Sequence, residues 1–387
     1  MTKRTVDVTM ALLRSAALGV TLTEEEKTLF GEESLSDLLG LAKKHDLAHL
    51  LAFGMKQNGL VTEASKGAEQ AIFKAAFRYE RLNFDYLRLI ETLESAKIPF
   101  LPLKGSVIRA YYPEPWMRTS CDIDVLVHKE DLERGIEAIS SSMSFELRER
   151  GTHDVSLFSA DGMTHVELHF DLVEEGRARK GDVVLDRLWE CVRLKDSYEY
   201  FYEMSDAFFY LYHIVHMAKH FEVGGCGVRP FLDLWILDHL PKADERARRE
   251  IIEEAELESF TDTAKRLSRV WFDGEERDSL TESMEQYILH GGVYGSVDNR
   301  VALQQGRKGG RLGYILSRLF LSYEHLVRYY PVLEKRRWLM PLMQVRRWFR
   351  LLNPASAKRA GRELNANRSV ESSEAERMEQ FLNDIGL

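Results

Sequence analysis

The chain has 387 residues, of which 44% are hydrophobic and 30% charged, a composition typical of globular proteins and unlike that of disordered or fibrous chains. At this length we expect about two or three domains, each with its own core. The formal net charge of -9 argues against a nucleic-acid binder that depends on overall positive charge.

Two features bear on location and redox state. The first residues lack the uninterrupted apolar run of a signal peptide, and no later stretch has the roughly 20 apolar residues of a membrane span. We therefore expect a cytoplasmic protein. Cys121, Cys191 and Cys226 lie far apart without a Cys-x-x-Cys pair, so we expect reduced thiols, with neither disulfides nor a zinc knuckle.

Residues 1–95 are expected to be helical. Apolar residues recur at helical spacing in three runs, Val6–Leu18, Ser36–Asn58 and Ala68–Ser95. Thr23, followed by three glutamates, has the pattern of a helix N-cap with an acidic first turn.

Residues 96–182 combine short strands with short helices. A strand over Ile98–Leu103 ends at Lys104-Gly105-Ser106, and a short helix is expected over Val107–Tyr112 before Pro113. The further elements expected are a strand over Cys121–Val127, a helix over Lys129–Ser141, and strands over Phe145–Arg150, Asp154–Phe158 and His165–Leu172, the last two joined by a turn at Ala160-Asp161-Gly162.

Helical patterns return at about residue 183. We expect a helical C-terminal domain over 183–353 and a polar tail over 354–387, partly disordered up to a short helix at Ala375–Ile385. The expected fold class is α+β: a small mixed-sheet core at 96–182, flanked by N-terminal and C-terminal helical regions.

Asp122 and Asp124 form the main candidate site. At positions i and i+2 of a strand they project from one face, with Cβ atoms about 6 to 7 Å apart. Carboxylates placed in this way can share divalent metal ions, as phosphoryl and nucleotidyl transfer require. The alternative is that both aspartates lie on the solvent-exposed face of an amphipathic strand, which is the commoner explanation of an isolated Asp-x-Asp.

The residues before this strand favour the metal site. A strand that ends at Gly105-Ser106 and opens a helix exposes backbone N–H groups, which together with the Ser106 hydroxyl suit phosphate oxygens. Alone, such a stretch is usually just a turn. With Asp122 and Asp124 on the next strand, it indicates a phosphate seat beside a metal site.

The order of strand, Gly-Ser, helix and Asp-x-Asp resembles the nucleotidyltransferase superfamily that includes DNA polymerase beta and the kanamycin nucleotidyltransferases. More narrowly, the chain resembles a family of uncharacterised bacterial nucleotidyltransferases. The residues that carry this resemblance are Leu103-Lys104-Gly105, Tyr112-Pro113, Arg118 and Asp122–Val127. The resemblance covers the core from about residue 98 to residue 171 and, more loosely, the helical region from residue 213 to residue 233.

The resemblance implies a nucleoside triphosphate as substrate and Mg²⁺ as cofactor, which Mn²⁺ can replace. The residues that it places at the nucleotide are Lys104, Gly105, Ser106, Arg118 and Ser120. Lys104 can meet a phosphate as a point charge and Arg118 as a fork of donors. Alternatively, either pairs with a carboxylate of the core.

The superfamily pattern also implies a third carboxylate on a later strand. In the stretch His165–Asp171, Glu167, His169 and Asp171 share one face. Glu167 matches the apolar-acid-apolar form, and we expect it to be a metal ligand and a base for the attacking hydroxyl. Asp171 is the rival, and the alternative that all three face solvent stays open.

His213, His216 and His220 fall at i, i+3 and i+7 on one face of an expected helix. Zinc binding is one interpretation, but no His-Glu-x-x-His motif is present. We favour a polar helix face toward the active cleft, near base, ribose or acceptor, with a purely structural role left open. In the next stretch, Arg229 and Asp233 either line the cleft or form an interdomain ion pair.

The segment from Arg307 to Arg362 is basic. It has 14 lysines and arginines against two acidic residues, a net charge of about +12, which leaves about -21 on the rest. Its cations are interleaved with Trp338, Trp348 and Phe349. Such a segment can contact an anionic membrane surface, a phosphate-bearing acceptor or RNA. The alternative is a solvated helix that pairs with the acidic remainder of the chain.

The sequence therefore predicts a magnesium-dependent nucleotidyltransferase in which Asp122, Asp124 and Glu167 hold the metal. An acceptor hydroxyl or phosphate attacks the α-phosphorus, and pyrophosphate is released. The acceptor class stays open among small molecules such as antibiotics, saccharides, protein side chains and RNA. Two rivals are a non-catalytic nucleotide- or partner-binding protein that retains the fold, and a histidine-dependent zinc hydrolase.

Overall fold

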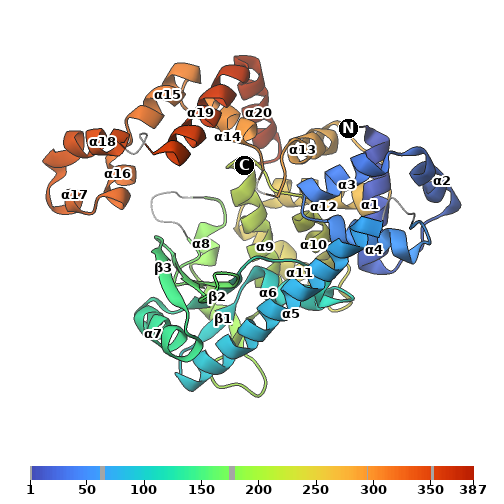
Figure 1. The fold of residues 1–387 in the computed structure, drawn as a ribbon, viewed down its shortest axis with the longest axis horizontal. Coiled ribbons are helices and arrows are strands. Elements are labelled where there is room, and N and C mark those ends of the chain that lie inside the picture. The colour runs from blue at the N-terminus through green and yellow to red at the C-terminus, as the bar shows by residue number, and fades with distance from the viewer. Residues whose placement is uncertain (1, 62–65, 174–178, 294, 350–352) are drawn as a thin grey trace. The chain divides into compact units, whose positions relative to one another are not determined.

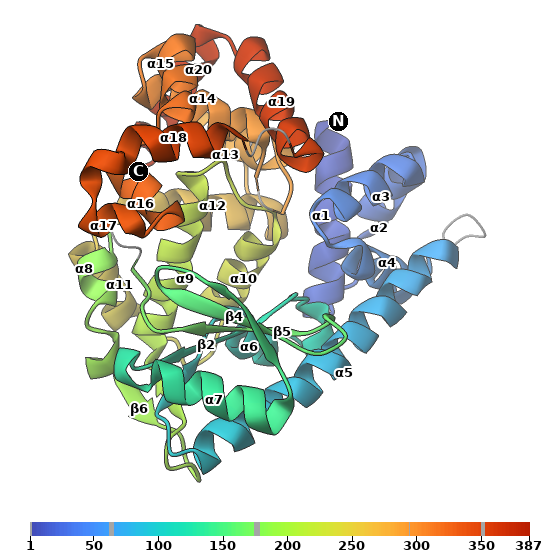
Figure 2. The ribbon, with the colours of Figure 1, turned by 60° about the vertical axis from the view of Figure 1, so that its left-hand side comes forward.

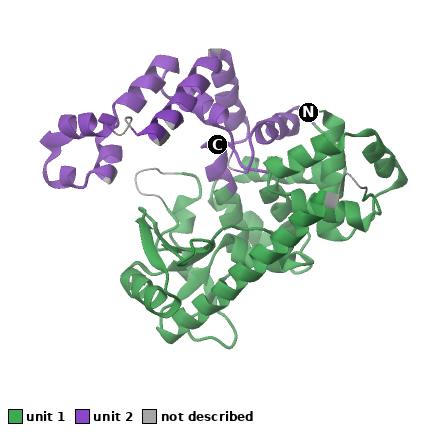
Figure 3. Cartoon of the chain, in the orientation of Figure 1, with its two compact units in different colours: residues 1–216, 228–277 green, residues 217–227, 278–387 purple. Residues whose placement is uncertain are grey.

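The computed structural model describes residues 2–61, 66–173, 179–293, 295–349 and 353–387 (Figure 1). The chain divides into two compact units (Figure 3). Unit 1 contains residues 1–216 and 228–277, and unit 2 contains residues 217–227 and 278–387. The sheet and the candidate site lie in unit 1.

Unit 1 begins with five helices, as the apolar spacing predicts: α1 (Lys3–Leu18), α2 (Glu24–Glu32), α3 (Leu35–Lys44), α4 (Ala48–Gln57) and α5 (Lys66–Ser95). Thr23 caps α2 through a reciprocal pair of hydrogen bonds with Glu26, which confirms the predicted N-cap. The run over Ser36–Asn58 is two helices because the chain turns at Asp46, whose φ is 56°. Apolar side chains of α1, α3 and α4 share one core.

A five-stranded mixed sheet follows, made of β1 (Phe100–Pro102), β2 (Ile123–Val127), β3 (Glu146–Arg150), β4 (Asp154–Phe158) and β5 (His165–His169). Their order across the sheet is β1-β2-β5-β4-β3. Strand β2 runs parallel to β5 and antiparallel to β1, and β4 is antiparallel to β5 and β3. The predicted α+β fold class is therefore confirmed.

The connection from β1 to β2 is more broken than expected. Helix α6 (Lys104–Ile108) begins directly after β1 and is followed by two short 3-10 helices, Arg109–Tyr111 and Pro115–Met117. The helix expected over Val107–Tyr112 thus begins three residues earlier, and from Arg109 it continues as a 3-10 helix. This early start places Lys104 and Gly105 inside α6.

Helices α5 and α7 (Leu132–Met143) pack on one face of the sheet (Figure 2). A further 3-10 helix, Lys129–Asp131, leads into α7. The strand residues buried in this layer include Ile123, Val125, Val127, Val166 and Leu168. Because side chains alternate along a strand, Asp124, Glu167 and His169 point to the opposite face.

The rest of unit 1 consists of α8 (Asp182–Leu185), a 3-10 helix (Leu188–Glu190), β6 (Val192–Leu194), β7 (Tyr202–Met204), most of α9 (Asp206–Phe221), α10 (Arg229–Asp238), α11 (Glu245–Glu254) and α12 (Glu258–Phe272). The last turn of α9, from Met217, is counted with unit 2. The expectation of helices alone after residue 183 is wrong here, because β6 and β7 form an antiparallel pair. Phe201, beside β7, is buried in the core of the main sheet and stabilises this pair.

Unit 2 is helical where it is described: α13 (Ser279–His290), α14 (Val297–Arg307), α15 (Gly310–Leu319), α16 (Tyr323–Tyr329), α17 (Val332–Lys335), a 3-10 helix (Arg337–Leu339), α18 (Met340–Trp348), α19 (Pro354–Ser369) and α20 (Ser372–Asp384). The short helix expected at Ala375–Ile385 is confirmed as α20, but the stretch before it, expected to be partly disordered, forms α19. The reason is that Ala366, Val370 and Ala375 are buried against Val301 and Tyr314.

Within the described ranges, no helix has both the length and the apolar character needed to cross a membrane. Cys121, Cys191 and Cys226 are free thiols.

Candidate active site

Asp124 and Glu167 lie opposite each other on two parallel strands of the sheet. The register pairs Asp124 of β2 with Glu167 of β5. Asp122 directly precedes β2, and His165 and His169 are the end residues of β5. Asp124 and His169 are buried, and the other three are half-buried. Strand pairing thus brings together the three carboxylates predicted to hold metal.

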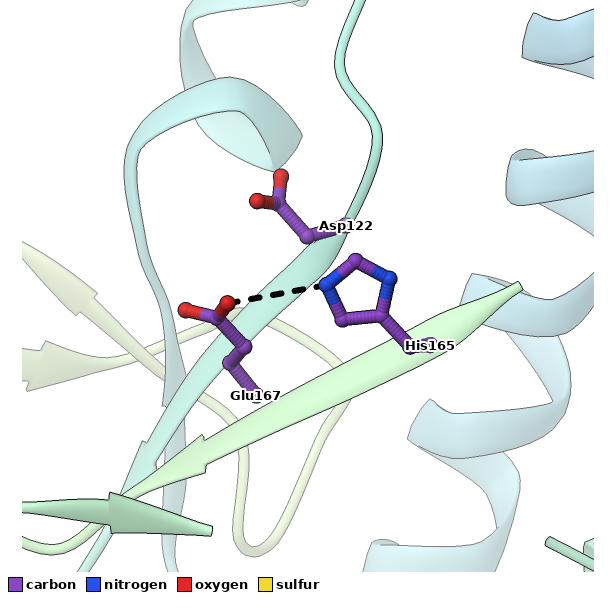
Figure 4. Close-up of side chains that lie close together, drawn as sticks. All are labelled: Asp122, His165 and Glu167. Carbon is purple, nitrogen blue, oxygen red and sulfur yellow. Dashed lines mark ion pairs between the residues drawn. The ribbon is translucent and has the colours of Figure 1, made fainter. Parts of the chain in front are cut away.

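The side chains of these five residues form two groups of ligand atoms. Asp122, His165 and Glu167 form one group, and Asp124, Glu167 and His169 form the other, with the ligand atoms of each group within 4.8 Å of one another. Figure 4 shows the first group, with Asp122 at the start of β2 near Glu167 and His165 of β5. Glu167 belongs to both groups.

Two histidines flank the Glu167 carboxylate. His165 Nε2 lies 3.5 Å from Oε1, and His169 Nε2 lies 3.6 Å from Oε2. Hydrogen bonds from His165 and His169 hold the pKa of Glu167 far below its usual range, although burial acts in the opposite direction. The hydrogen bond to Glu167 likewise raises the pKa of His165. Glu167 is therefore firmly ionised.

His169 also contacts Asp124, with Nε2 3.1 Å from Oδ1. Burial lowers the pKa of His169, but its hydrogen bonds to Asp124 and Glu167 outweigh burial and raise the pKa. A protonated imidazole at this position is a counter-ion for two carboxylates.

The pKa of Asp122 is shifted in the opposite direction to that of Glu167. Burial raises the pKa of its carboxyl group, and repulsion from Asp124 and Glu167 raises it further, while Lys104 opposes the rise. Carboxylates this close repel one another unless a cation lies between them. The cluster therefore has the electrostatic character of a cation site.

Lys104 lies at the edge of the carboxylate cluster. It opens α6 with a φ of 37°, in the left-handed region that residues with a side chain seldom adopt. Its Nζ lies 3.7 Å from Asp124 Oδ1. Burial lowers the pKa of Lys104, but the charges of Asp124, Asp122 and Glu167, together with Tyr212, outweigh burial and raise the pKa above its usual value. Lys104 is therefore a charged group beside the site.

Gly105 allows a close contact between α6 and the segment before β2. A Cβ at Gly105 would lie 3.3 Å from Ser120 Cβ and 3.6 Å from Arg118 Nη1. Arg109, one turn later, donates from Nε to the Gly105 carbonyl oxygen at 2.7 Å and from Nη2 to Ser120 Oγ at 2.6 Å. These bonds attach the start of α6 to Ser120, two residues before Asp122.

Arg109 is buried without a carboxylate partner among the described residues. Burial, together with the charge of Arg118, lowers its pKa to about 10. Arg109 packs closely beside Arg78, Tyr79 and Ser120, with its guanidinium 5.7 Å from the centre of the Tyr79 ring. A buried guanidinium without a counter-ion attracts an anion, because burial alone penalises its charge.

Residues 31–273 match the model of a protein family described as uncharacterised nucleotidyltransferase. The match covers more than half of the chain and includes the whole five-stranded sheet. The chain belongs to this nucleotidyltransferase family. Searches of curated proteins and of solved structures gave no significant match. The resemblance seen in the sequence is thereby confirmed at the level of the family.

In this chain, Arg118 pairs with a core carboxylate, the alternative that the sequence left open. Its Nε lies 3.0 Å from both carboxylate oxygens of Asp233, its Nη2 lies 2.9 Å from Oδ2, and its Nη1 donates to the Thr119 carbonyl at 2.8 Å. Asp233 is fully buried and also accepts a hydrogen bond from Tyr112 at 2.7 Å. Arg118 therefore positions the segment before β2 and does not present a free fork of donors to a phosphate.

Arg229 supports the same segment independently of Asp233. Its Nη1 donates to the carbonyl oxygen and the hydroxyl of Thr119 at 2.9 and 3.1 Å and lies 3.6 Å from Asp46 Oδ2. Helix α10 thus contacts the core through Arg229 and Asp233 separately, and the two do not pair with each other.

Asp171 and the histidines of α9 lie outside both ligand groups. Asp171 accepts a hydrogen bond from the backbone of Val173 at 2.9 Å. His213 Nε2 lies 2.9 Å from the carbonyl oxygen of Pro230, and burial lowers the pKa of His213. In the described part of the chain, none of His213, His216 and His220 belongs to a group that could hold a metal. The geometry therefore favours Glu167 over Asp171.

Three residues near the carboxylates were not assigned a role from the sequence. The sequence contains a signal for His165, because it lies two residues before Glu167 and so shares its strand face. Arg109 also had one, since it follows Gly105-Ser106 by one helical turn. Tyr212 of α9 had none: its ring is buried near the charges of Lys104 and Asp124 through the packing of α9 alone.

Proposed function

We propose that the protein is a magnesium-dependent nucleotidyltransferase that moves a nucleoside monophosphate from a nucleoside triphosphate to an acceptor. The observation that supports this function most is the position of Glu167. It faces Asp124 across parallel strands and shares a ligand group with each of Asp122 and Asp124. A carboxylate common to two groups suits two neighbouring cations, as nucleotidyl transfer uses. Membership of the family supports the same general reaction.

The residues fit magnesium. Asp122, Asp124 and Glu167 supply the hard oxygen ligands that Mg²⁺ prefers, and the lowered pKa of Glu167 keeps that ligand ionised. Mn²⁺ fits as well, because it also accepts the imidazole nitrogens that His165 and His169 bring beside the carboxylates. When bound, the metal neutralises the triphosphate and stabilises the attacking and leaving oxygens.

The residues of α6 would orient the triphosphate. Lys104 is charged and lies beside the carboxylates, Gly105 lets α6 pack closely against Ser120, and Ser106 adds a hydroxyl donor. With five residues, α6 is too short for a strong helix dipole, so cations matter more here than the dipole does.

Arg109 joins the proposed nucleotide contacts together with Ser120. Its guanidinium has no carboxylate partner in the described ranges and lies between Gly105 and the Ser120 hydroxyl. A phosphate oxygen within reach of this buried guanidinium would give its charge a counter-ion. Arg118 is left out, since Asp233 already holds it.

In the proposed reaction, an acceptor hydroxyl or phosphate oxygen forms a bond to the α-phosphorus. The bond from that phosphorus to the oxygen of the β-phosphate breaks and pyrophosphate leaves, while the proton of an acceptor hydroxyl passes to water. A very low pKa makes Glu167 a good ligand and a poor base. We therefore propose Glu167 as a metal ligand alone.

The experiment is a labelled-transfer assay on the full chain. Each α-³²P-labelled nucleoside triphosphate is incubated with Mg²⁺ or Mn²⁺ and with small molecules, saccharides, protein or RNA as acceptors. We expect transfer of label and release of pyrophosphate, and we expect the double variant Asp122→Asn, Asp124→Asn to lose both. The matched control, Glu137→Gln, removes an exposed carboxylate of α7 and should keep full activity.

Two results would contradict the proposal. Undiminished transfer by the double variant would exclude these aspartates from the chemistry. Metal-dependent nucleotide binding without transfer to any acceptor class would instead favour a non-catalytic binding protein that retains the fold.

A further inference from the structure

Helix α15 carries an exposed apolar stripe. Leu312, Leu316, Leu319 and Phe320 fall at i, i+4, i+7 and i+8 and are between 41% and 75% exposed. On the other side of α15, Tyr314 is buried in a core with residues of α14, α19 and α20. The stripe is therefore not needed to hold unit 2 together.

Helix α18 and the turn before it repeat the pattern. Trp338, Leu342, Val345 and Phe349 fall at i, i+4, i+7 and i+11 and are between 42% and 75% exposed. Met343, on the opposite side of α18, is buried in a core with Leu326 and Leu333. Both helices thus have one apolar side inside unit 2 and a second one exposed.

The two stripes adjoin at the C-terminal ends of their helices, and we call the region that carries both of them the α15–α18 face. The rings of Phe320 and Trp348 pack edge to face, with centroids 5.7 Å apart. Trp348 Nε1 donates a hydrogen bond to the Leu319 carbonyl oxygen at 2.9 Å. These contacts join the C-terminal ends of α15 and α18 inside unit 2.

Exposed cations accompany the apolar stripes. Lys335, Arg336, Arg337 and Arg346 are exposed, and none of them forms an ion pair within the described ranges. The guanidinium groups of Arg337 and Arg346 lie over the rings of Tyr323 and Tyr330. Pairing with an acidic residue, the alternative considered for this segment, occurs at Arg318, which contacts Glu363 at 2.9 Å.

We propose that the α15–α18 face docks on the surface of an anionic lipid bilayer. Exposed Leu, Val, Phe and Trp side chains can enter the boundary between headgroups and acyl chains, while flanking Lys and Arg side chains contact anionic headgroups. The net charge of about +12 over residues 307–362 complements such a surface. RNA fits less well, because most of the stripe residues are aliphatic and offer bases neither stacking nor hydrogen bonds.

The test measures flotation of the full chain with vesicles. Vesicles of phosphatidylcholine with phosphatidylglycerol are compared with vesicles of phosphatidylcholine alone, at low and high salt. We expect binding to the anionic vesicles to exceed binding to the neutral ones by more than about tenfold and to weaken with salt. This outcome does not depend on the proposed catalytic activity, since no nucleotide is added.

Variants locate the binding surface. The triple variant Leu312→Ser, Leu342→Ser, Phe349→Ser and the triple variant Lys335→Gln, Arg336→Gln, Arg337→Gln should each weaken binding more than about tenfold. The matched control, Phe73→Ser with Phe77→Ser, removes two exposed phenylalanines from α5 in unit 1 and should leave binding unchanged. Circular dichroism checks that every variant is folded.

Several outcomes would overturn the proposal. These are no binding of the unaltered chain to anionic vesicles, full binding by a folded apolar variant, and a loss of binding in the α5 control as large as in the others. Binding to an RNA oligonucleotide without binding to vesicles would assign the face to RNA. Loss of a dimer in the apolar variant, again without vesicle binding, would assign it to a second copy of the chain.

Discussion

Nε2 of His169 and Nζ of Lys104 converge on the same oxygen of Asp124, at 3.1 and 3.7 Å. The imidazole comes from the end of β5, and the ammonium group comes from the first residue of α6. Two cationic groups thus compensate one buried carboxylate when no metal ion is bound. A divalent cation bound here takes over part of that compensation, so metal binding and the electrostatics of the fold are linked.

Asp122→Asn should change stability in opposite directions with and without metal. Burial and repulsion from Asp124 and Glu167 raise the pKa of Asp122. A neutral asparagine relieves that repulsion, so in EDTA we expect the free energy of unfolding to rise by roughly 1 kcal/mol. In the unaltered chain, Mg²⁺ at 100 times its Kd should raise the free energy of unfolding by about 2.7 kcal/mol. The same Mg²⁺ concentration should stabilise the variant much less.

Thermal denaturation with EDTA, Mg²⁺ and Mn²⁺ measures both effects. Glu137→Gln, on the exposed side of α7, is the control and should behave like the unaltered chain. Equal stabilisation of Asp122→Asn and the unaltered chain by the metal would remove Asp122 from the ligand set.

Arg109→Gln should weaken nucleotide binding. Loss of a charge-assisted hydrogen bond to phosphate is worth about 1.5–3 kcal/mol, so we expect KM for the nucleotide to rise by about tenfold or more, with a smaller change in kcat. Steady-state kinetics measures both constants. Arg246→Gln, an exposed arginine of α11, is the control. An unchanged KM would place the triphosphate elsewhere.

Asp233→Ala should be strongly destabilising. It leaves Arg118, which is 11% exposed, without a counter-ion in the interior. Breaking a buried ion pair from one side costs about 3–5 kcal/mol. Urea denaturation measures the loss. The exposed pair Arg187–Glu254 provides the comparison, since Glu254→Ala should cost less than about 1 kcal/mol. Similar costs for the two variants would show that the Arg118–Asp233 pair contributes little.

Stability should fall as the pH drops from about 6.5 toward 4, partly because of His45. Burial, with a smaller contribution from Lys44, lowers the pKa of His45 to about 4, and neither ring nitrogen has a hydrogen-bond partner among the described residues. The unfolded chain therefore takes up a proton first as the pH falls, and the contribution present above pH 6.5 is lost over that range.

A pH series of urea denaturation tests this effect. His45→Leu should reduce the loss of stability between pH 6.5 and 4 by up to about 3 kcal/mol. His325→Gln, at an exposed histidine of α16, should not change the pH profile. A profile that His45→Leu leaves unaltered would show that His45 titrates normally in the folded chain.

Much of the fold could be predicted where a local pattern carries the information. Thr23 and Glu26 mark the start of α2, and period-two alternation marks β4 and β5. The break at Asp46 and the short strands β6 and β7 could not be predicted, because a left-handed turn and a pair of three-residue strands depend on neighbours distant in sequence. Helix α19 was missed since few of its side chains are apolar.

The sequence by itself determined which side chains share a strand face, because that direction alternates from each residue to the next. It therefore placed Asp122 with Asp124, and Glu167 with His169. Only the tertiary structure decided which strands pair: the parallel register of β2 and β5 puts Glu167 opposite Asp124. It also decided that Arg118 binds Asp233, 115 residues away. Contacts over such separations depend on long-range packing, which leaves no periodic signal in the chain.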